Sequence, residues 1–265
     1  MSYKLPHQEY DTDQSRQEKE LLDQWKRETQ APFQGWDFSY LEGRWQEDQP
    51  DFKYKEQVAD LLHQDIESAL DIGTGGGEFL LKLKPFPPKM KATESWPPNV
   101  SVAKERLKDV GVEVVGIDQK DPLPFADQEF DTIINRQDAY QASEVMRVLK
   151  DGGKFFTQQV PADNLFDLAA EFGIEKQGDD WNLDLAKEQF VQLGAVVKQA
   201  REWEGKMQFN DIGALVYYLS HVPWVVPDFK VEKYQQELHH LEQQLKDKGS
   251  LVYTQKRFLL EVEKK

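Results

Sequence analysis

The chain has 265 residues, of which 48 are acidic and 33 basic, and its formal net charge is −15 at pH 7. A surface of this charge repels phosphate backbones. It argues against nucleic acid as a partner, because nucleic-acid-binding proteins gain affinity from Lys and Arg beside phosphates. The sequence contains no Cys, which excludes disulfides, a thiol nucleophile and a thiolate metal site.

The N-terminal residues 1–20 are polar and acidic and have no apolar stretch of the signal-peptide type. No run in the sequence approaches 18 apolar residues, so no transmembrane helix is expected. We therefore expect a soluble, cytoplasmic protein without a membrane partner. The length allows one large domain, or a core domain with a smaller annex.

The N-terminal segment has the composition of a cap on a larger domain. Residues 1–12 are expected to be a frayed terminus. The chain then shows helical spacing, with Leu21, Leu22 and Trp25 on one face. This helix either packs on the surface of the main domain or covers a ligand cleft. Residues 31–50 are rich in aromatic side chains and are interrupted by Pro and Gly, which indicates an irregular segment docked on the main domain.

Short apolar runs then alternate with helical patterns, beginning with a helix in residues 51–67. The expected strands are 68–73, 90–94, 112–118, 129–136 and 154–160, and the expected helices are 77–84, 99–110 and 143–150. Strands alternate with helices at this spacing when right-handed crossovers build a parallel sheet. Further along the chain we expect helices at 164–173, 183–194 and 231–249, strands within 195–209 and at 257–264, and an apolar, aromatic insert at about 205–230.

A glycine-rich turn follows the first of these strands, in the string "LDIGTGGGEFL". Ligands of open α/β sheets bind at the carboxyl ends of the strands, and glycine lets a ligand approach the backbone closely. A dinucleotide fingerprint would need a third Gly where Glu78 stands, and a phosphate-binding P-loop would need a Lys that is absent. An acidic residue at the strand end, Asp71, suits a cationic ammonium group better than a phosphate.

The string resembles the first motif of the class I S-adenosylmethionine-dependent methyltransferases, of the methyltransferase type 11 kind. The resemblance extends in order over residues 67–160. Glu94 ends the second strand, 23 positions after Asp71. The stretches "VVGIDQKDPLPFADQEFDTIINR" and "EVMRVLKDGGKFFTQQV" are similar to the third, fourth and fifth strand regions of that family.

The resemblance implies an α/β fold with a Rossmann-like, doubly wound, seven-stranded and mostly parallel sheet whose last strand is antiparallel. An N-terminal helical and aromatic cap over residues 1–50 would precede a methyltransferase domain over residues 51–265. It also implies S-adenosyl-L-methionine as the cofactor. The implied cofactor-binding residues are Asp71, Gly73, Thr74, Gly75, Gly77, Glu94, Ser95, Trp96, Asp118, Gln119, Asn135 and Arg136.

Roles follow from the family's motifs. Asp71 and the glycines would hold the methionine portion, and Glu94 would accept hydrogen bonds from the two ribose hydroxyls. Trp96 would pack against the adenine, and Asp118 would take its exocyclic amine. The gap between Asp118 and the "LPF" string is one residue longer than the family's pattern, which leaves Asp121 as an alternative.

The substrate side is expected in segments outside the common core. The candidate substrate-binding residues are Trp36, Tyr140, Gln158, Tyr218, His221 and Trp224, and the candidate catalytic residues are His221 and Arg136. His221 is the nominated base of near-neutral pKa. A lone His and buried aromatic side chains also serve structural roles, so these assignments stay open. No His pair or carboxylate set suggests a metal.

The string "NRQD" follows the fourth strand, where amino-nitrogen methylators of nucleic acids and glutamine carry an "NPPY"-type tetrapeptide. This departure, the net charge and the aromatic segments favour a small-molecule methyl acceptor. A methyltransferase acting on RNA or protein and a non-catalytic cofactor-binding protein are the alternatives. The sequence leaves the acceptor atom and the oligomeric state open.

Overall fold

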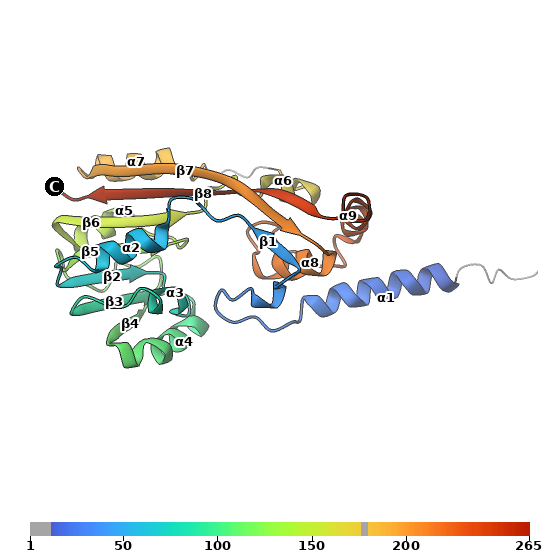
Figure 1. Ribbon diagram of the computed structural model, residues 1–265, viewed down its shortest axis with the longest axis horizontal. Helices are drawn as coiled ribbons and strands as arrows, with labels where there is room; N and C mark the ends of the chain where they lie inside the picture. Colours follow the sequence, from blue (N-terminus) through green and yellow to red (C-terminus); the bar gives the residue numbers. More distant parts are fainter. Residues whose placement is uncertain (1–11, 176–179) are drawn as a thin grey trace, which may run out of the picture.

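An eight-stranded sheet runs through the computed structural model, which describes residues 12–175 and 180–265 (Figure 1). The expected frayed terminus lies outside these residues, except for Thr12, where the first helix begins. The strands are β1 (Trp45–Glu47), β2 (Ser68–Ile72), β3 (Lys89–Glu94), β4 (Val112–Gly116), β5 (Phe130–Arg136), β6 (Leu149–Gln159), β7 (Val196–Phe209) and β8 (Leu251–Glu263). Their order across the sheet is β1-β7-β8-β6-β5-β2-β3-β4.

Five neighbouring strands, from β4 to β6, pair in parallel. β8 is antiparallel to both β6 and β7. The predicted mostly parallel sheet with an antiparallel last strand is therefore confirmed. The strand count needs a correction, because β1 adds an eighth strand by pairing Trp45 with Phe209 at the far end of β7. β1 comes from the aromatic segment that was expected to be irregular.

Helices cover both faces of the parallel strands. The α-helices of the described residues are α1 (Thr12–Glu28), α2 (Tyr54–Leu62), α3 (Glu78–Leu81), α4 (Pro97–Leu107), α5 (Ala142–Val148), α6 (Phe166–Glu171), α7 (Leu183–Gln192), α8 (Ile212–His221) and α9 (Gln235–Lys248). Every residue of β2 is buried. Its Ala69 packs with α2, α3 and α4, while Leu70 and Ile72 pack with α5 and α7. Both faces of the central strand are thus covered, as parallel sheets require.

The long ribbon of β7 and β8 reaches beyond the parallel strands toward α8 and α9 (Figure 1). A third buried cluster forms there and includes Trp25 of α1, Leu165, Tyr217 of α8 and Leu238 of α9. The N-terminal segment is therefore packed on the C-terminal half of the chain. Among residues 12–175 and 180–265, no helix has an apolar stretch long enough to cross a membrane.

Two of the helix boundaries that differ from the expected ones have a local cause in the sequence. The helix expected at 77–84 is a single turn, α3, because Pro85 and the Pro87–Pro88 pair prevent it from continuing. The helix expected at 143–150 ends at Val148, and β6 begins at once with a bulge. Both corrections lie at element ends, where local patterns specify structure weakly.

Arg44 connects the N-terminal segment to the rest of the chain. Its guanidinium donates to both carboxylate oxygens of Glu28, at 3.1 and 2.9 Å, and to both of Asp211, at 2.7 and 3.0 Å. Asp211 is also the N-cap of α8 and accepts from the backbone N–H of Ala214. One planar donor therefore links α1, the turn before β1, and α8.

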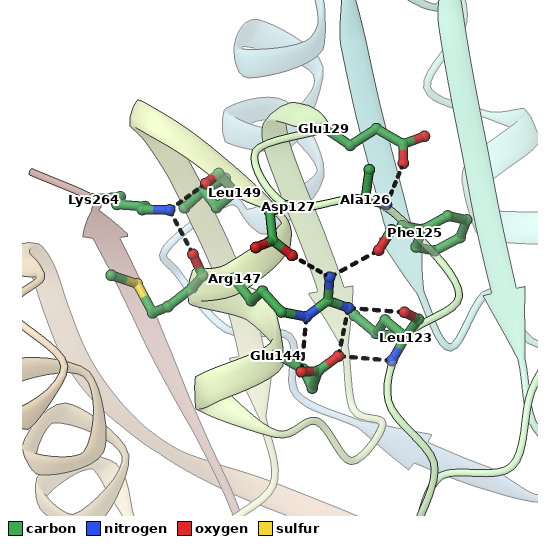
Figure 2. Close-up of polar contacts among 10 residues, drawn as sticks. Leu123, Phe125, Ala126, Asp127, Glu129, Glu144, Arg147, Leu149 and Lys264 are labelled. Carbon is green, nitrogen blue, oxygen red and sulfur yellow. Dashed lines mark hydrogen bonds and ion pairs between the residues drawn. The ribbon is translucent and has the colours of Figure 1, made fainter.

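Arg147 of α5 holds the loop that leads from β4 to β5 (Figure 2). Its guanidinium donates to the carbonyl oxygens of Leu123 and Phe125, each at 2.8 Å. It also pairs with Glu144 at 2.7 Å and with Asp127 at 2.8 Å. These contacts fix the conformation of a loop that contains two prolines and runs along the edge of the sheet.

We expect Arg147→Met to lower the free energy of unfolding by about 2 to 3 kcal/mol, because two loop carbonyls and Glu144 would lose charged hydrogen bonds. Urea unfolding measures the change. Arg16→Met is the matched control, since Arg16 pairs with Glu20 on the exposed face of α1. Its effect should stay below about 0.5 kcal/mol. Equal effects of the two substitutions would contradict this assignment.

Candidate functional site

The glycine loop turns back over the end of β3. The backbone N–H groups of Gly73 and Thr74 both donate to the carbonyl oxygen of Thr93, at 3.1 and 2.9 Å. Gly73 has φ = +74°, in the left-handed region, and an added Cβ would lie 2.1 Å from Oδ2 of Asp138. Only glycine fits there without moving Asp138. The loop thus presents bare backbone at the carboxyl ends of β2 and β3.

Three acidic side chains flank this loop. Asp71 on β2 and Glu94 at the end of β3 are 4% and 6% exposed, and Asp138 follows β5. Burial raises the pKa of Asp71 to about 7, and the nearby carboxylates of Asp138 and Glu94 add to the rise. Burial and Asp138 also raise the pKa of Glu94. A site that disfavours its own negative charges in this way is suited to receive a cation.

Asn135 forms the internal support of the site. Its Nδ2 donates to the carbonyl of Ile72 at 2.9 Å, and its Oδ1 accepts from Thr157 at 2.8 Å and from Gln159. Nδ2 also donates to the carbonyl of Asp138 at 3.2 Å. The Asn135 side chain, which the resemblance implies in cofactor binding, is thus occupied in fixing the turn that carries Asp138.

Arg136 lies at the exposed end of β5, with its guanidinium 4.6 Å from the centre of the Phe79 ring. Its positive charge counteracts the rise in the pKa of Asp71. Tyr54 lies beneath, stacked on Phe79 and donating to the carbonyl of Asn135 at 2.8 Å. Arg136 therefore stands beside Asp71 on the same face of the sheet, held by an aromatic platform.

The edge formed by β3 and β4 carries the residues expected at the adenine. Trp96 is 63% exposed, and its backbone N–H donates to Oε1 of Glu94 at 2.7 Å. Ser95 lies between them. Asp118 is exposed and accepts from the backbone N–H of Lys120 at 3.0 Å. Gln119 donates to Oδ1 of Asp138 at 3.0 Å. The alternative residue Asp121 is exposed in the same turn.

The aromatic N-terminal segment reaches this site. An added Cβ at Gly75 would lie 3.4 Å from Cδ1 of Trp36, so the indole covers the loop. The ring of Trp36 is 5.6 Å from that of Trp224, and Phe33 lies 4.3 Å from the ring of His221. Trp36 therefore lies at the glycine loop with Trp224 beside it, and Phe33 connects this pair to His221.

Three other candidates lie deeper. Tyr140 packs in the apolar cluster with Phe155 and Trp181, and its buried hydroxyl has no hydrogen-bond partner among the described residues. Tyr218 packs between Phe38 and Trp45, and burial raises its pKa. Gln158 is 5% exposed on β6 and pairs across the sheet with Arg136.

Two relevant residues were not assigned to these places from the sequence. Asp138 belongs to the "NRQD" string after the fourth expected strand, and its side chain lies against Gly73. Arg257 of β8 was not among the predicted site residues, although it lies two residues before Leu259 and so on the same face of the strand. A charged residue at an inward position was the signal that could have found it. Among the described residues, no group of three or more His, Cys, Asp or Glu side chains could hold a metal ion.

Comparisons with known proteins agree with this geometry. Residues 70–157 match the family model described as a methyltransferase domain. A Bacillus subtilis protein, YcgJ, described as an uncharacterized methyltransferase, is 34% identical over 109 residues, which cover 37% of this chain and 43% of YcgJ.

Solved structures share the fold. The crystal structure of YcgJ covers 80% of this chain and 98% of that one, with a TM-score of 0.60 and 18% identity. A functionally unknown protein from Deinococcus radiodurans covers 83% of this chain and 91% of its own, with a TM-score of 0.55 and 14% identity. These two likenesses concern the fold alone.

Proposed function

We propose that this chain, whose residues 70–157 match a methyltransferase domain, is a class I S-adenosylmethionine-dependent methyltransferase and that it methylates a small-molecule acceptor. We place the cofactor at the carboxyl ends of β2, β3 and β5. The observation that carries this placement is the set of three carboxylates, Asp71, Glu94 and Asp138, around a glycine loop. S-adenosylmethionine supplies a methyl group activated by a positively charged sulfur.

The residues present fit that cofactor. The hydroxyl of Thr74 is buried in the glycine loop beside Asp71, close enough to stabilise its carboxylate, and makes no other hydrogen bond within the described residues. Asp71 and Asp138 would face the cationic methionine portion. Glu94 would accept from the ribose hydroxyls with the oxygen that Trp96 does not occupy.

The adenine would lie along the neighbouring edge. Trp96 offers an exposed ring there, and Asp118 and Gln119 offer polar groups. Gln119 already holds Asp138 through a hydrogen bond, so the two ends of the cofactor site are linked.

The aromatic segment 31–50 would act as the cap of the site. Tyr217 of α8 donates to the carbonyl of Pro32 at 2.9 Å, and Arg44 holds the other end of the segment. With Trp36 over Gly75, this segment would exclude water from the methyl group and align the acceptor.

His221 has the geometry of a possible base. Its Nδ1 lies 2.8 Å from the carbonyl oxygen of Tyr217, which can only accept, so Nδ1 carries the proton. The neutral ring then presents a lone pair on Nε2, for which the described residues provide no partner. We assign His221 to proton removal from the acceptor and Arg136 to acceptor positioning.

The experiment that tests this function supplies S-adenosylmethionine labelled in its methyl group, together with a cell extract separated into small molecules, RNA and protein. We expect label in the small-molecule fraction, because the aromatic cap and the charge of −15 oppose a polyanion. Label in the RNA or protein fraction would contradict a small-molecule acceptor and would identify the acceptor as RNA or protein. Cofactor binding with no transfer to any fraction would make the protein a non-catalytic binder.

A further inference from the structure

Arg257 is a partly buried cation with an incomplete set of partners. Its Nη1 donates to Oδ1 of Asn164 at 2.9 Å and to the carbonyl of Lys256 at 2.7 Å. Within the described residues, its Nε and Nη2 make no hydrogen bond and no carboxylate lies within ion-pair distance. Burial lowers the pKa of Arg257, the opposite of what a carboxylate partner would do. Buried charges are normally paired, so an anion is missing from this environment.

The sheet register places Arg257 on the face that carries Arg136. Gln158 of β6 pairs with Arg136 on one side and with Leu259 of β8 on the other. Paired residues share a face, and so do residues two apart on a strand, which puts Arg257 on the same face as Leu259. Arg136, Gln158 and Leu259 form a row across the three strands. Because β8 runs antiparallel to β6, Arg257 lies two residues from this row in the direction of the carboxyl ends of β5 and β6.

Arg136 connects this position to the cofactor site. Its charge acts on Asp71 on one side and on Arg257 on the other. Two guanidinium groups thus stand near one another in a protein of net charge −15. Two positive charges repel each other at short distance, and such pairs are typical of a site that binds an anion.

Arg257 lines a pocket together with the acidic residues Asp163, Glu202 and Glu204, of which Asp163 pairs with Lys256 at 2.7 Å. Glu47 of β1 contributes only at a distance, because its Oε2 accepts from Nε2 of Gln255 at 2.9 Å. Oε1 of Gln255 is buried without a partner. Tyr218 of α8 is near enough to Arg257 for its charge to raise the pKa of Arg257. These groups could contact the polar body of an acceptor.

Resting on the proposed function, we propose that the methyl acceptor carries an anionic oxygen group, a carboxylate or a phosphate, that the free donors of Arg257 bind together with Arg136. The anion would lie at β8, and the acceptor atom would point back toward Asp71 and the cofactor. A planar fork of donors matches either group in a bidentate manner.

Calorimetric binding of four probes to the full chain, in the presence and absence of S-adenosylhomocysteine, tests this proposal. The probes are benzoate, phenyl phosphate and their neutral counterparts benzamide and phenol. We expect one of the anions to bind at least about tenfold more tightly than its neutral counterpart. Preference for benzoate or for phenyl phosphate then distinguishes a carboxylate from a phosphate acceptor.

The variants Arg257→Gln and Arg201→Gln complete the design. Arg201 lies on the neighbouring strand β7 and pairs with Asp51, so its loss should change anion affinity less than about twofold. Arg257→Gln should weaken anion binding at least about tenfold. Arg257→Lys, which keeps the charge but not the fork, should be intermediate and serves if the Gln variant fails to fold.

Three results would overturn the proposal: equal affinity for charged and neutral probes, equal effects of the Arg257 and Arg201 substitutions, or no anion binding at millimolar concentration. Titration of the same samples with S-adenosylmethionine separates this failure from failure of the proposed function. If the protein binds the cofactor but no anion, only the anionic acceptor is contradicted. If it does not bind the cofactor, the proposed function is contradicted as well.

Discussion

Asp71→Asn is expected to weaken the binding of S-adenosylmethionine by about 10- to 100-fold while raising the stability of the free protein at pH 8. The loss of affinity follows from removing a carboxylate that would face the ammonium group, since hydrogen bonds between charged groups contribute about 1.5 to 3 kcal/mol. Calorimetric titration measures the affinity, and thermal unfolding measures the stability.

The gain in stability follows from the raised pKa of Asp71. The pKa is 3.8 for an ordinary Asp and about 7 here, because burial and two neighbouring carboxylates oppose the charge. Between these values the folded protein binds more protons than the unfolded chain, so the free energy of unfolding falls as pH rises from 4 to 7. The buried charge then costs up to about 4 kcal/mol at pH 8.

The pH profile separates this account from a general loss of structure. Wild-type affinity for the cofactor should fall as pH drops below 7, where Asp71 becomes neutral, and Asp71→Asn should flatten that profile. Asp60→Asn is the control, because Asp60 is exposed on α2, has no assigned role in the site and should leave both measurements unchanged. A less stable Asp71→Asn protein at pH 8 would contradict the account.

Gly73→Ala is expected to abolish cofactor binding and to destabilise the protein. The left-handed backbone at φ = +74° costs a residue with a Cβ about 1 to 2 kcal/mol. The new methyl group would also lie 2.1 Å from Oδ2 and 2.3 Å from Cβ of Asp138, so the whole side chain must leave its place. Calorimetry and urea unfolding give the two effects.

Gly111→Ala is a matched control for the strain that a Cβ causes in left-handed backbone. Gly111 has φ = +75°, almost the same as Gly73, but an added Cβ there meets nothing within 4 Å. We expect a similar strain cost and no change in cofactor affinity. If the two substitutions weaken cofactor binding equally, the close packing of Gly73 against Asp138 has no part in the site.

Local patterns were sufficient to predict the parallel strands and the turn after β2. β2 is a short, fully buried strand with the sequence "SALDI", glycines follow it, and the next strand ends at Glu94. Because carboxyl ends of parallel strands meet at one edge, their proximity could be expected from the sequence.

The remaining features depend on contacts between distant segments. β1 exists because Trp45 finds the far end of β7, and nothing in its three residues specifies a strand. Asp138 lies against Gly73 because Asn135 folds the turn after β5 back over β2. That Arg257 forms no ion pair within the described residues is likewise a property of the assembled sheet.

Titration of the wild-type protein with S-adenosylmethionine at pH 8 tests the central claim most directly. The account predicts binding at micromolar concentration and an increase in the unfolding temperature on saturation. Absence of binding heat and of any thermal stabilisation at millimolar cofactor would contradict the placement of the cofactor between Asp71, Glu94 and Asp138.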